Sequence, residues 1–294
     1  MAESYLVTGA TGFLGSHLVA RLLNEGKSVV VLKRKRSDLR RLTSVQDKLV
    51  FYDLEEANLA DVFARHDFKG VLHCATDYGR KNTLPLQLLE ANLLLPLELL
   101  ELAARAGVSL FINTDTILDK GVSHYSLSKK QFLDWLKNYS GELRCVNVAL
   151  EHFYGPGDDE TKFVSDMMKR IMHGEKIALT AGEQKRDFIY FEDVVEAFSA
   201  IWSHLKDEGK GFSHFEVGSG VSTRIRELLE LIVKLSGNKS AHLDFGVLPY
   251  RVNEVMSSQV NLEGLLALGW VPRVSLEHGL KAMFEQVRLE KEIK

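Results

Sequence analysis

Two side chains that could exchange a proton with a substrate lie four residues apart, at Tyr125 and Lys129. In a helix, this spacing places both side chains on one face. A lysine ammonium beside a phenol favours the phenolate and lowers the tyrosine pKa, which makes the hydroxyl a workable proton donor or acceptor near neutral pH. Thr114, at the end of an apolar run, adds a hydroxyl that could polarise a carbonyl or orient the tyrosine proton. Because a tyrosine one turn before a lysine is common by chance, the interpretation depends on the elements around the pair.

A glycine-rich stretch near the N-terminus supplies the first of these elements. The apolar run at 5–7 leads into Gly9, Gly12 and Gly15, and residues 16–23 alternate polar and apolar side chains at helical spacing. Glycines allow a sharp turn and a close approach to a ligand, and the helix N-terminus offers N–H groups to a pyrophosphate. The stretch predicts a dinucleotide site, with a purely structural turn as the alternative. The expected cofactor-binding residues are Gly9, Thr11, Gly12, Phe13, Leu14 and Gly15.

Strand and helix patterns alternate through the first half of the chain. Strands are predicted at 28–32, 48–52, 70–75 and 109–113, with helices at 59–66 and 84–106. This order predicts an α/β fold, a doubly wound parallel Rossmann sheet over residues 1–150. Ligands of such sheets collect beyond the carboxyl ends of the strands. We therefore expect Asp53, Leu54, His73, Ala75 and the helical Asn92 to line the cofactor, although His73 could equally be a packed core histidine.

A basic run, Lys33-Arg34-Lys35-Arg36, follows the second predicted strand. An NAD site usually has an acid here for the ribose hydroxyls, whereas positive charge suits a 2′-phosphate. We therefore predict NADP as cofactor, with Lys33 and Arg34 as ligands and NAD as the alternative. Lys35 and Arg36 are equally well explained as a solvated basic loop.

Composition excludes several other classes of protein. The net charge of −3 over 294 residues gives no signature of nucleic-acid binding. Polar residues interrupt the longest apolar stretch, 84–102, so we expect no membrane span, and the N-terminus lacks the pattern of a signal peptide. Cys74 and Cys145 lie in apolar runs, as buried thiols do in a reducing compartment. We expect a cytoplasmic protein without a bound metal.

The second half predicts a smaller mixed α/β substrate lobe over residues 151–294, from which a segment at about 186–220 returns to the first domain. Amphipathic helices are expected at 163–173, 225–235 and 276–287, with few strong strands. Arg186 and Arg251 are isolated cations whose guanidinium groups could clamp a diphosphate. The alternative for each is an exposed or ion-paired arginine.

Taken jointly, these residues resemble the extended short-chain dehydrogenase/reductase superfamily, whose members act on nucleotide sugars. The resemblance covers nearly the whole chain and implies catalytic roles for Thr114, Tyr125 and Lys129, the last two also contacting the cofactor. It further implies that Asp115, Thr116, His152, Arg186 and Arg251 bind substrate, although relatives often carry asparagine where His152 stands. Besides the residues above, it rests on Phe153-Tyr154-Gly155-Pro156-Gly157, on residues 186–194 and 215–220, and on Leu268-Gly269-Trp270-Val271-Pro272.

The residues after Thr114 separate the chemistries within this superfamily. Related dehydratases follow the catalytic threonine with Asp-Glu, and epimerase/reductases resembling GDP-fucose synthase carry cysteine at the glutamate position. Thr116 occupies that place here. The missing glutamate argues against dehydration, since no base remains for the C5 proton, and the missing cysteine argues against epimerisation. The short interval from Thr114 to Tyr125, with residues 113–116 and 118–121, is most similar to the CDP-abequose and CDP-paratose synthase group of 4-ketoreductases.

That similarity implies NADPH-dependent reduction of the C4 keto group of a nucleotide-diphosphate 4-keto-6-deoxy or 3,6-dideoxy sugar, a step toward bacterial surface polysaccharide such as lipopolysaccharide O-antigen. One alternative is a nucleotide-sugar 4-epimerase with retained NAD. Another is a non-catalytic dinucleotide sensor or scaffold, which the intact Thr114, Tyr125 and Lys129 disfavour. In relatives the long helices matching 84–106 and 125–139 often form a dimer interface, so a homodimer is expected.

Overall fold

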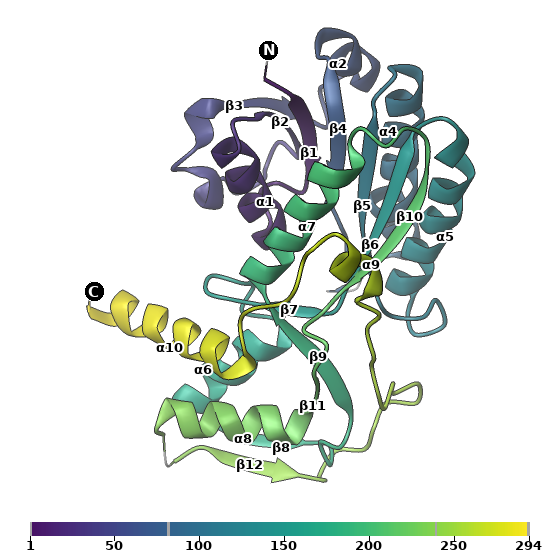
Figure 1. Cartoon of the computed structure of the whole chain (residues 1–294). Coiled ribbons are helices and arrows are strands. Elements are labelled where there is room, and N and C mark those ends of the chain that lie inside the picture. The colour runs from purple at the N-terminus through teal and green to yellow at the C-terminus, as the bar shows by residue number, and fades with distance from the viewer. Residues whose placement is uncertain (1, 81–82, 239, 293–294) are drawn as a thin grey trace. The chain divides into compact units, whose positions relative to one another are not determined.

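The computed structural model describes residues 2–80, 83–238 and 240–292, drawn in Figure 1. The chain divides into two compact units. The first unit comprises Met1–Leu150, Val195–Glu216 and Glu263–Trp270, and the second comprises Glu151–Val194, Val217–Leu262 and Val271–Lys294.

A seven-stranded sheet forms the centre of the first unit, in the order β10-β6-β5-β4-β1-β2-β3. The six strands from β1 to β6 pair in parallel, with Thr8 opposite both Leu32 and His73, and His73 opposite Asn113. The doubly wound parallel sheet is thereby confirmed. Its strands are β1 (Ser4–Thr8), β2 (Ser28–Lys33), β3 (Leu49–Asp53), β4 (Phe68–His73), β5 (Leu110–Thr116), β6 (Arg144–Leu150) and β10 (Gly211–Val217).

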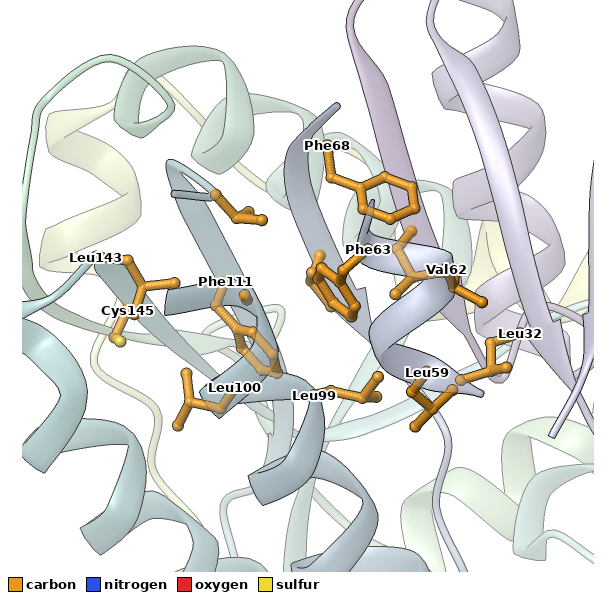
Figure 2. Close-up of a cluster of buried hydrophobic side chains, with 14 of the residues drawn as sticks. Leu32, Leu59, Val62, Phe63, Phe68, Leu99, Leu100, Phe111, Leu143 and Cys145 are labelled. Atoms are coloured by element: carbon orange, nitrogen blue, oxygen red, sulfur yellow. The ribbon is translucent and has the colours of Figure 1, made fainter. Parts of the chain in front are cut away.

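Helices cover both faces of this sheet. On one face α2 (Leu59–Arg65), α4 (Leu95–Arg105) and α5 (His124–Asn138) pack over alternate strand residues, and Figure 2 shows this apolar cluster. On the other face α1 (Phe13–Asn24) lies beside α7 (Phe191–Leu205), where the Trp202 indole N–H donates to Glu25 at 2.9 Å. The inner strands β1, β2, β4, β5 and β6 are buried on both faces and are therefore mostly apolar, which made them recognisable in the sequence. The remaining elements of this unit are α9 (Glu263–Ala267) and the short 3-10 turns η1 (Arg40–Leu42), η2 (Gln46–Lys48) and η4 (Tyr139–Gly141).

The helix predicted at 84–106 is interrupted by a π-helical turn. It consists of α3 (Pro85–Leu89), the π turn η3 (Glu90–Leu94) and α4, and the N–H of Leu95 donates to the carbonyl of Glu90, five residues earlier. Pro96 has no N–H with which to bond the carbonyl of Asn92, as an α-helix would require. The wider turn accommodates that loss and places the side chain of Asn92 in a fully buried position.

Short strands and amphipathic helices make up the second unit. Its strands form a three-stranded sheet, β11-β9-β7, and a two-stranded sheet, β12-β8. The predicted helices are confirmed, and the strands are weak in sequence because they are short and partly exposed. Their bounds are β7 (His152–Tyr154), α6 (Phe163–Met172), β8 (Lys176–Leu179), β9 (Lys185–Tyr190), β11 (Ser222–Arg224), α8 (Ile225–Ser236), β12 (His242–Phe245) and α10 (Leu276–Glu292).

The segment that returns to the first unit differs from the one expected at 186–220. Strand β9 pairs with β7 and β11, so residues 185–190 belong to the sheet of the second unit. The returning segments are Val195–Glu216 and Glu263–Trp270. The assignment of the second unit as the substrate lobe stays a prediction.

Two further expectations concern the surface. Within the described ranges, no helix has both the length and the apolar character needed to span a membrane. Leu86, Leu94 and Trp135 are 74%, 56% and 46% exposed on α3, η3 and α5, the helices expected to form a dimer interface. The homodimer stays a prediction.

Candidate active site

Thr114, Tyr125 and Lys129 come from two adjacent elements of the first unit. Thr114 lies near the carboxyl end of β5 and is buried, and its hydroxyl donates to the carbonyl of His73 on β4 at 3.1 Å. Tyr125 and Lys129 lie one turn apart in α5, as the sequence predicts. Ser123 caps this helix by accepting the N–H of Ser126 at 3.1 Å. The cap fixes the start of the helix one residue before Tyr125.

Lys129 is buried and carries an unsatisfied ammonium. The residue has 0% exposure, and among the described residues its Nζ has no hydrogen-bond partner. Burial lowers the pKa of Lys129 to about 8, although the Asp115 carboxylate acts in the opposite direction. A buried polar group without a partner is unfavourable, so this nitrogen is well suited to donate to an oxygen of a bound ligand.

Tyr125 stays protonated at neutral pH. Burial raises the pKa of its hydroxyl, the nearby Tyr78 and Asp115 act in the same direction, and a hydrogen bond with the Thr116 side chain opposes them. The expectation of a lowered pKa for Tyr125 is wrong in this structure, because desolvation by burial is the largest influence on this hydroxyl and raises its pKa. The result favours a tyrosine that donates a proton over one that removes a proton.

Tyr78, which the sequence did not single out, lies against Tyr125. Their ring centroids are 5.3 Å apart. Asn92 holds the turn that carries Tyr78: it accepts the N–H of Asp77 and donates to the carbonyl of Asp77, each at 2.8 Å, and it also donates to Ser128 on α5 at 3.0 Å. Asn92, expected to bind cofactor, therefore uses its side chain to join the π turn, the Asp77 turn and α5.

Both carboxylate oxygens of Asp115 accept hydrogen bonds from other residues of the first unit. Its Oδ1 accepts the N–H of Thr116 at 2.7 Å, and its Oδ2 accepts from Lys130 at 2.9 Å and from Asn147 at 3.0 Å. The substrate contact expected of Asp115 is left without support, because the carboxylate is fully buried among these donors. Thr116, in contrast, places its hydroxyl beside that of Tyr125.

The glycine turn leaves no room for side chains. Gly9 has φ +66°, and a Cβ there would lie 2.5 Å from the nitrogen of Ala75 and 2.6 Å from the carbonyl carbon of Cys74. A Cβ on Gly15 would lie 2.7 Å from the carbonyl carbon of Gly9. Gly12 precedes α1 without a side-chain cap, and the first turn of α1 has no acidic residue. The exposed backbone and the positive end of the helix dipole suit a pyrophosphate. Thr11, Phe13 and Leu14 lie in or beside the turn, the last two buried.

The ends of β2 and β3 carry several of the expected cofactor ligands, and some of these already have partners within the first unit. Lys33 and Asp53 are directly opposite in the register of β2 and β3, and their side chains form an ion pair. Lys35 pairs with Glu56. Arg34, in contrast, is exposed and has no ion pair within the described part of the chain. Because Lys33 and Lys35 each pair with an acid, the positive charge available to a ligand here is that of the exposed Arg34 and Arg36, of which Arg34 lies closer to the end of β2. Leu54 follows β3, and its N–H donates to the carbonyl of Lys33 at 2.7 Å.

His73 is a fully buried histidine. Its Nδ1 lies 2.9 Å from the hydroxyl of Thr8, which also accepts the N–H of Ala75 at 3.2 Å. Burial, with a smaller contribution from the Lys129 charge, lowers its pKa well below the usual value, so the ring is neutral at physiological pH. These contacts fit the packed-histidine alternative, and cofactor contacts by His73 and Ala75 stay predictions. Cys74 and Cys145 are both free thiols.

Two of the three candidate substrate residues of the second unit have side-chain partners within that unit. His152 has its Nδ1 3.2 Å from a carboxylate oxygen of Glu151. Arg186 forms an ion pair with Glu254 at 2.5 Å, which is the ion-paired alternative considered for it. Arg251 is exposed. It is the first residue of a turn in which the N–H of Glu254 donates to the Arg251 carbonyl at 3.1 Å. Diphosphate binding by the two arginines stays a prediction.

Comparison with known proteins shows the family of this chain. Residues 5–218 match the NAD dependent epimerase/dehydratase family. The chain is 35% identical over 292 residues to the CDP-abequose synthase of Salmonella muenchen, covering 96% of this chain and 97% of that protein. It is 30% identical over 299 residues to the CDP-abequose synthase of Salmonella typhimurium, covering 98% and 99%.

Solved structures give the same result. The UDP-glucose 4-epimerase of Thermotoga maritima with UDP-glucose superposes with a TM-score of 0.83 at 26% identity, covering 99% of this chain and 100% of that one. The UDP-glucose 4-epimerase of Thermus thermophilus in complex with NAD has a TM-score of 0.81 at 26% identity, covering 97% and 99%. The resemblance drawn from the motifs is confirmed: the chain belongs to the NAD dependent epimerase/dehydratase family of extended short-chain dehydrogenases/reductases.

Proposed function

We propose that this protein is an NADPH-dependent 4-ketoreductase that acts on a nucleotide-diphosphate 4-keto-6-deoxy or 3,6-dideoxy sugar. Such a reaction would complete a deoxysugar precursor of bacterial surface polysaccharide. The observation that carries the proposal is a protonated Tyr125 one helical turn from the Lys129 ammonium, which has no hydrogen-bond partner among the residues that the structure describes. The similarity to two CDP-abequose synthases supports the choice of a nucleotide deoxysugar as substrate.

The residues of the first unit fit a nicotinamide dinucleotide. The side-chain-free cradle at Gly9 and Gly15 matches a pyrophosphate, and the buried Nζ of Lys129 matches a ribose hydroxyl. Relatives in this family have been solved with NAD. When bound in reduced form, this cofactor supplies a hydride to the carbonyl carbon of the substrate.

Side chains of this protein supply the proton and stabilise the negative charge that develops on the carbonyl oxygen. Tyr125 donates its proton to the carbonyl oxygen as the alkoxide forms, and its raised pKa keeps that proton in place until then. The Thr116 hydroxyl orients the Tyr125 hydroxyl through their hydrogen bond. The Thr114 hydroxyl donates its proton to the His73 carbonyl in this structure, so its oxygen can only accept a hydrogen bond from a substrate. It can donate to the substrate oxygen once the hydroxyl rotates away from His73. Lys129 orients the cofactor ribose.

A 4-epimerase with retained NAD is the second candidate, favoured by the similarity to two UDP-glucose 4-epimerase structures. The two functions differ in their net use of cofactor. A ketoreductase oxidises one NADPH for each sugar reduced, whereas an epimerase interconverts intact sugars without net oxidation. Dehydration is disfavoured because Asp115 is committed to Lys130 and Asn147 and no acid stands at position 116.

A panel of substrates tests the proposal. CDP-, dTDP- and GDP-4-keto-6-deoxy sugars are each incubated with NADPH or NADH, reduced cofactor is followed by absorbance, and products are identified by NMR. We expect stoichiometric oxidation of NADPH with at least one keto sugar, and a new hydroxyl at C4. Interconversion of an intact UDP-hexose without net oxidation would identify an epimerase instead. Cofactor binding without turnover of any sugar would indicate a sensor.

Arg34 should determine the preference for NADPH. Arg34→Gln removes the first exposed cation beyond β2, which would pair with a 2′-phosphate. Hydrogen bonds to charged groups contribute about 1.5–3 kcal/mol, so the KM for NADPH should rise about 10- to 100-fold while that for NADH stays unchanged. Steady-state kinetics with each cofactor measure this, with Arg36→Gln as the matched control. An undiminished NADPH preference in Arg34→Gln would show that the phosphate is recognised elsewhere.

A further inference from the structure

Lys130, the residue after Lys129, joins helix α5 to strand β5 in the first unit. Its Nζ donates to Oδ2 of Asp115 at 2.9 Å and to the backbone carbonyl of Thr116 at 2.7 Å. The Asp115 side chain has no exposed surface, and that of Lys130 is 22% exposed. The ion pair is therefore largely desolvated, a setting in which losing one partner is far more costly than at the surface.

The carboxylate that Lys130 contacts is itself fixed by neighbouring strands. Asn147 on β6 donates to Asp115 at 3.0 Å and accepts from Asn113 on β5 at 2.8 Å. The amide nitrogen of Asn147 also lies 3.1 Å from Nδ1 of His214 on β10. These contacts make Asp115 a rigid anchor at the carboxyl end of the sheet, and Lys130 connects α5 to this anchor.

We propose that Lys130 is a positioning residue, which ties the N-terminal half of α5 to Asp115 and Thr116 and so holds Tyr125 and Lys129 in place for proton transfer. The inference rests on the proposed function for the identity of the transfer. Catalytic groups must be held within about 0.5 Å of their productive geometry, and a misplacement of about 1 Å can lower the rate about a hundredfold. Because Lys130 bonds the backbone of Thr116, it also places the hydroxyl that contacts Tyr125.

The pair also sets the charge around Tyr125 and Lys129. Asp115 faces Tyr125, Lys129 and Lys130 from α5 and His214 from β10. His214, which also faces Glu216, Lys130 and Lys137, is neutral near pH 7 because burial lowers its pKa. The Cys74 thiol beside Lys129 stays protonated because burial raises its pKa to about 12. Among the described residues, the charged side chains that act on Lys129 and Tyr125 are therefore Asp115 and Lys130, and their charges have opposite signs.

Substitutions at the two ends of this ion pair should therefore act in opposite directions. Lys130→Met leaves the carboxylate uncompensated, which favours the charged form of Lys129 and raises its pKa above about 8. Asp115→Asn removes the negative charge and leaves the Lys130 cation, so it lowers the same pKa. Loss of local packing alone would shift this pKa in the same direction in both variants, because both break the same bond, whereas charges held close to Lys129 shift it in opposite directions.

The titration is measured on the cofactor-free protein by NMR of isotope-labelled lysine, with the Lys129 signal assigned by its loss in Lys129→Met. Lys130→Arg should restore the wild-type titration. Lys69→Met, which breaks an ion pair with Asp207 at the opposite end of the sheet, should change nothing. If Lys130→Met does not fold, Asp115→Asn/Lys130→Met removes both charges and should titrate close to wild type. Equal shifts, or none, in the two single variants would overturn the inference.

Kinetics provide the second readout. With a keto sugar that the wild type reduces, Lys130→Met should lower kcat about 10- to 100-fold with little change in KM, and Lys130→Arg should recover most of it. A KM effect with unchanged kcat would contradict positioning. The NMR titration needs no substrate, so a wild type inactive on every keto sugar would refute the proposed function and leave the charge relation of Lys130 independently testable.

Discussion

Tyr125→Phe should lower kcat for reduction of a keto sugar by about 10²- to 10⁴-fold, the usual contribution of a positioned proton donor. The variant loses only the hydroxyl, and the ring keeps its packing against Tyr78. The dissociation constant for NADPH should therefore stay within a few-fold of wild type. Single-turnover kinetics and a fluorescence titration of NADPH measure the two quantities separately.

Tyr139→Phe is the matched control for this substitution. Tyr139 is the residue that follows α5, and its ring packs on the apolar cluster of the first unit, far along the helix from Lys129. Its loss of a hydroxyl should leave turnover unchanged. If Tyr125→Phe were as active as Tyr139→Phe, another group would have to supply the proton.

Gly9→Ala should abolish dinucleotide binding and destabilise the protein. Forcing a side chain into the left-handed conformation costs about 1–2 kcal/mol. The methyl group would also collide with the backbone at Cys74 and Ala75, and crowding of this kind costs about 1–3 kcal/mol. We expect the free energy of unfolding to fall by about 2–5 kcal/mol in denaturant titrations. Because the added methyl group displaces the glycine turn, Gly9→Ala should show no binding of NADPH by isothermal titration calorimetry.

Gly26→Ala separates the two effects. Gly26 also has a left-handed backbone, with φ +73°, but no atom of the described part of the chain outside its immediate neighbours would lie within 4 Å of its Cβ. This variant should lose only about 1–2 kcal/mol and bind NADPH normally. If Gly9→Ala and Gly26→Ala had the same free energy of unfolding and the same affinity for NADPH, the backbone atoms close to Gly9 would not be what excludes a side chain there.

Local pattern was sufficient to predict the main framework. Apolar runs at 28–32, 70–75 and 109–113 predicted parallel strands because a sheet covered on both faces is apolar throughout. The helical spacing of Tyr125 and Lys129 and the glycine turn were likewise sufficient to propose a shared site in the first unit. These features depend on neighbours within about one turn or one strand, which the sequence contains directly.

Features that depend on pairing between distant segments could not be predicted in this way. Lys33 and Asp53 are 20 residues apart, and only the register of β2 with β3 brings them into an ion pair. The commitment of Asp115 to Lys130 and Asn147 requires the packing of α5 on the sheet. The pKa of Tyr125 depends mainly on how deeply its hydroxyl is buried, and the spacing between Tyr125 and Lys129 in the sequence contains no information on burial.

The contrast between the glycine turn and the end of β2 has a consequence for how this enzyme can diverge. A methyl group at Gly9 or Gly15 meets backbone atoms, so the part of the site suited to a pyrophosphate tolerates almost no substitution. Arg34 is exposed, and exposed positions usually change stability by less than about 0.5 kcal/mol when substituted. Under the proposed role for Arg34, a lineage could therefore exchange one coenzyme for the other through single substitutions beyond β2 while the dinucleotide framework stays fixed.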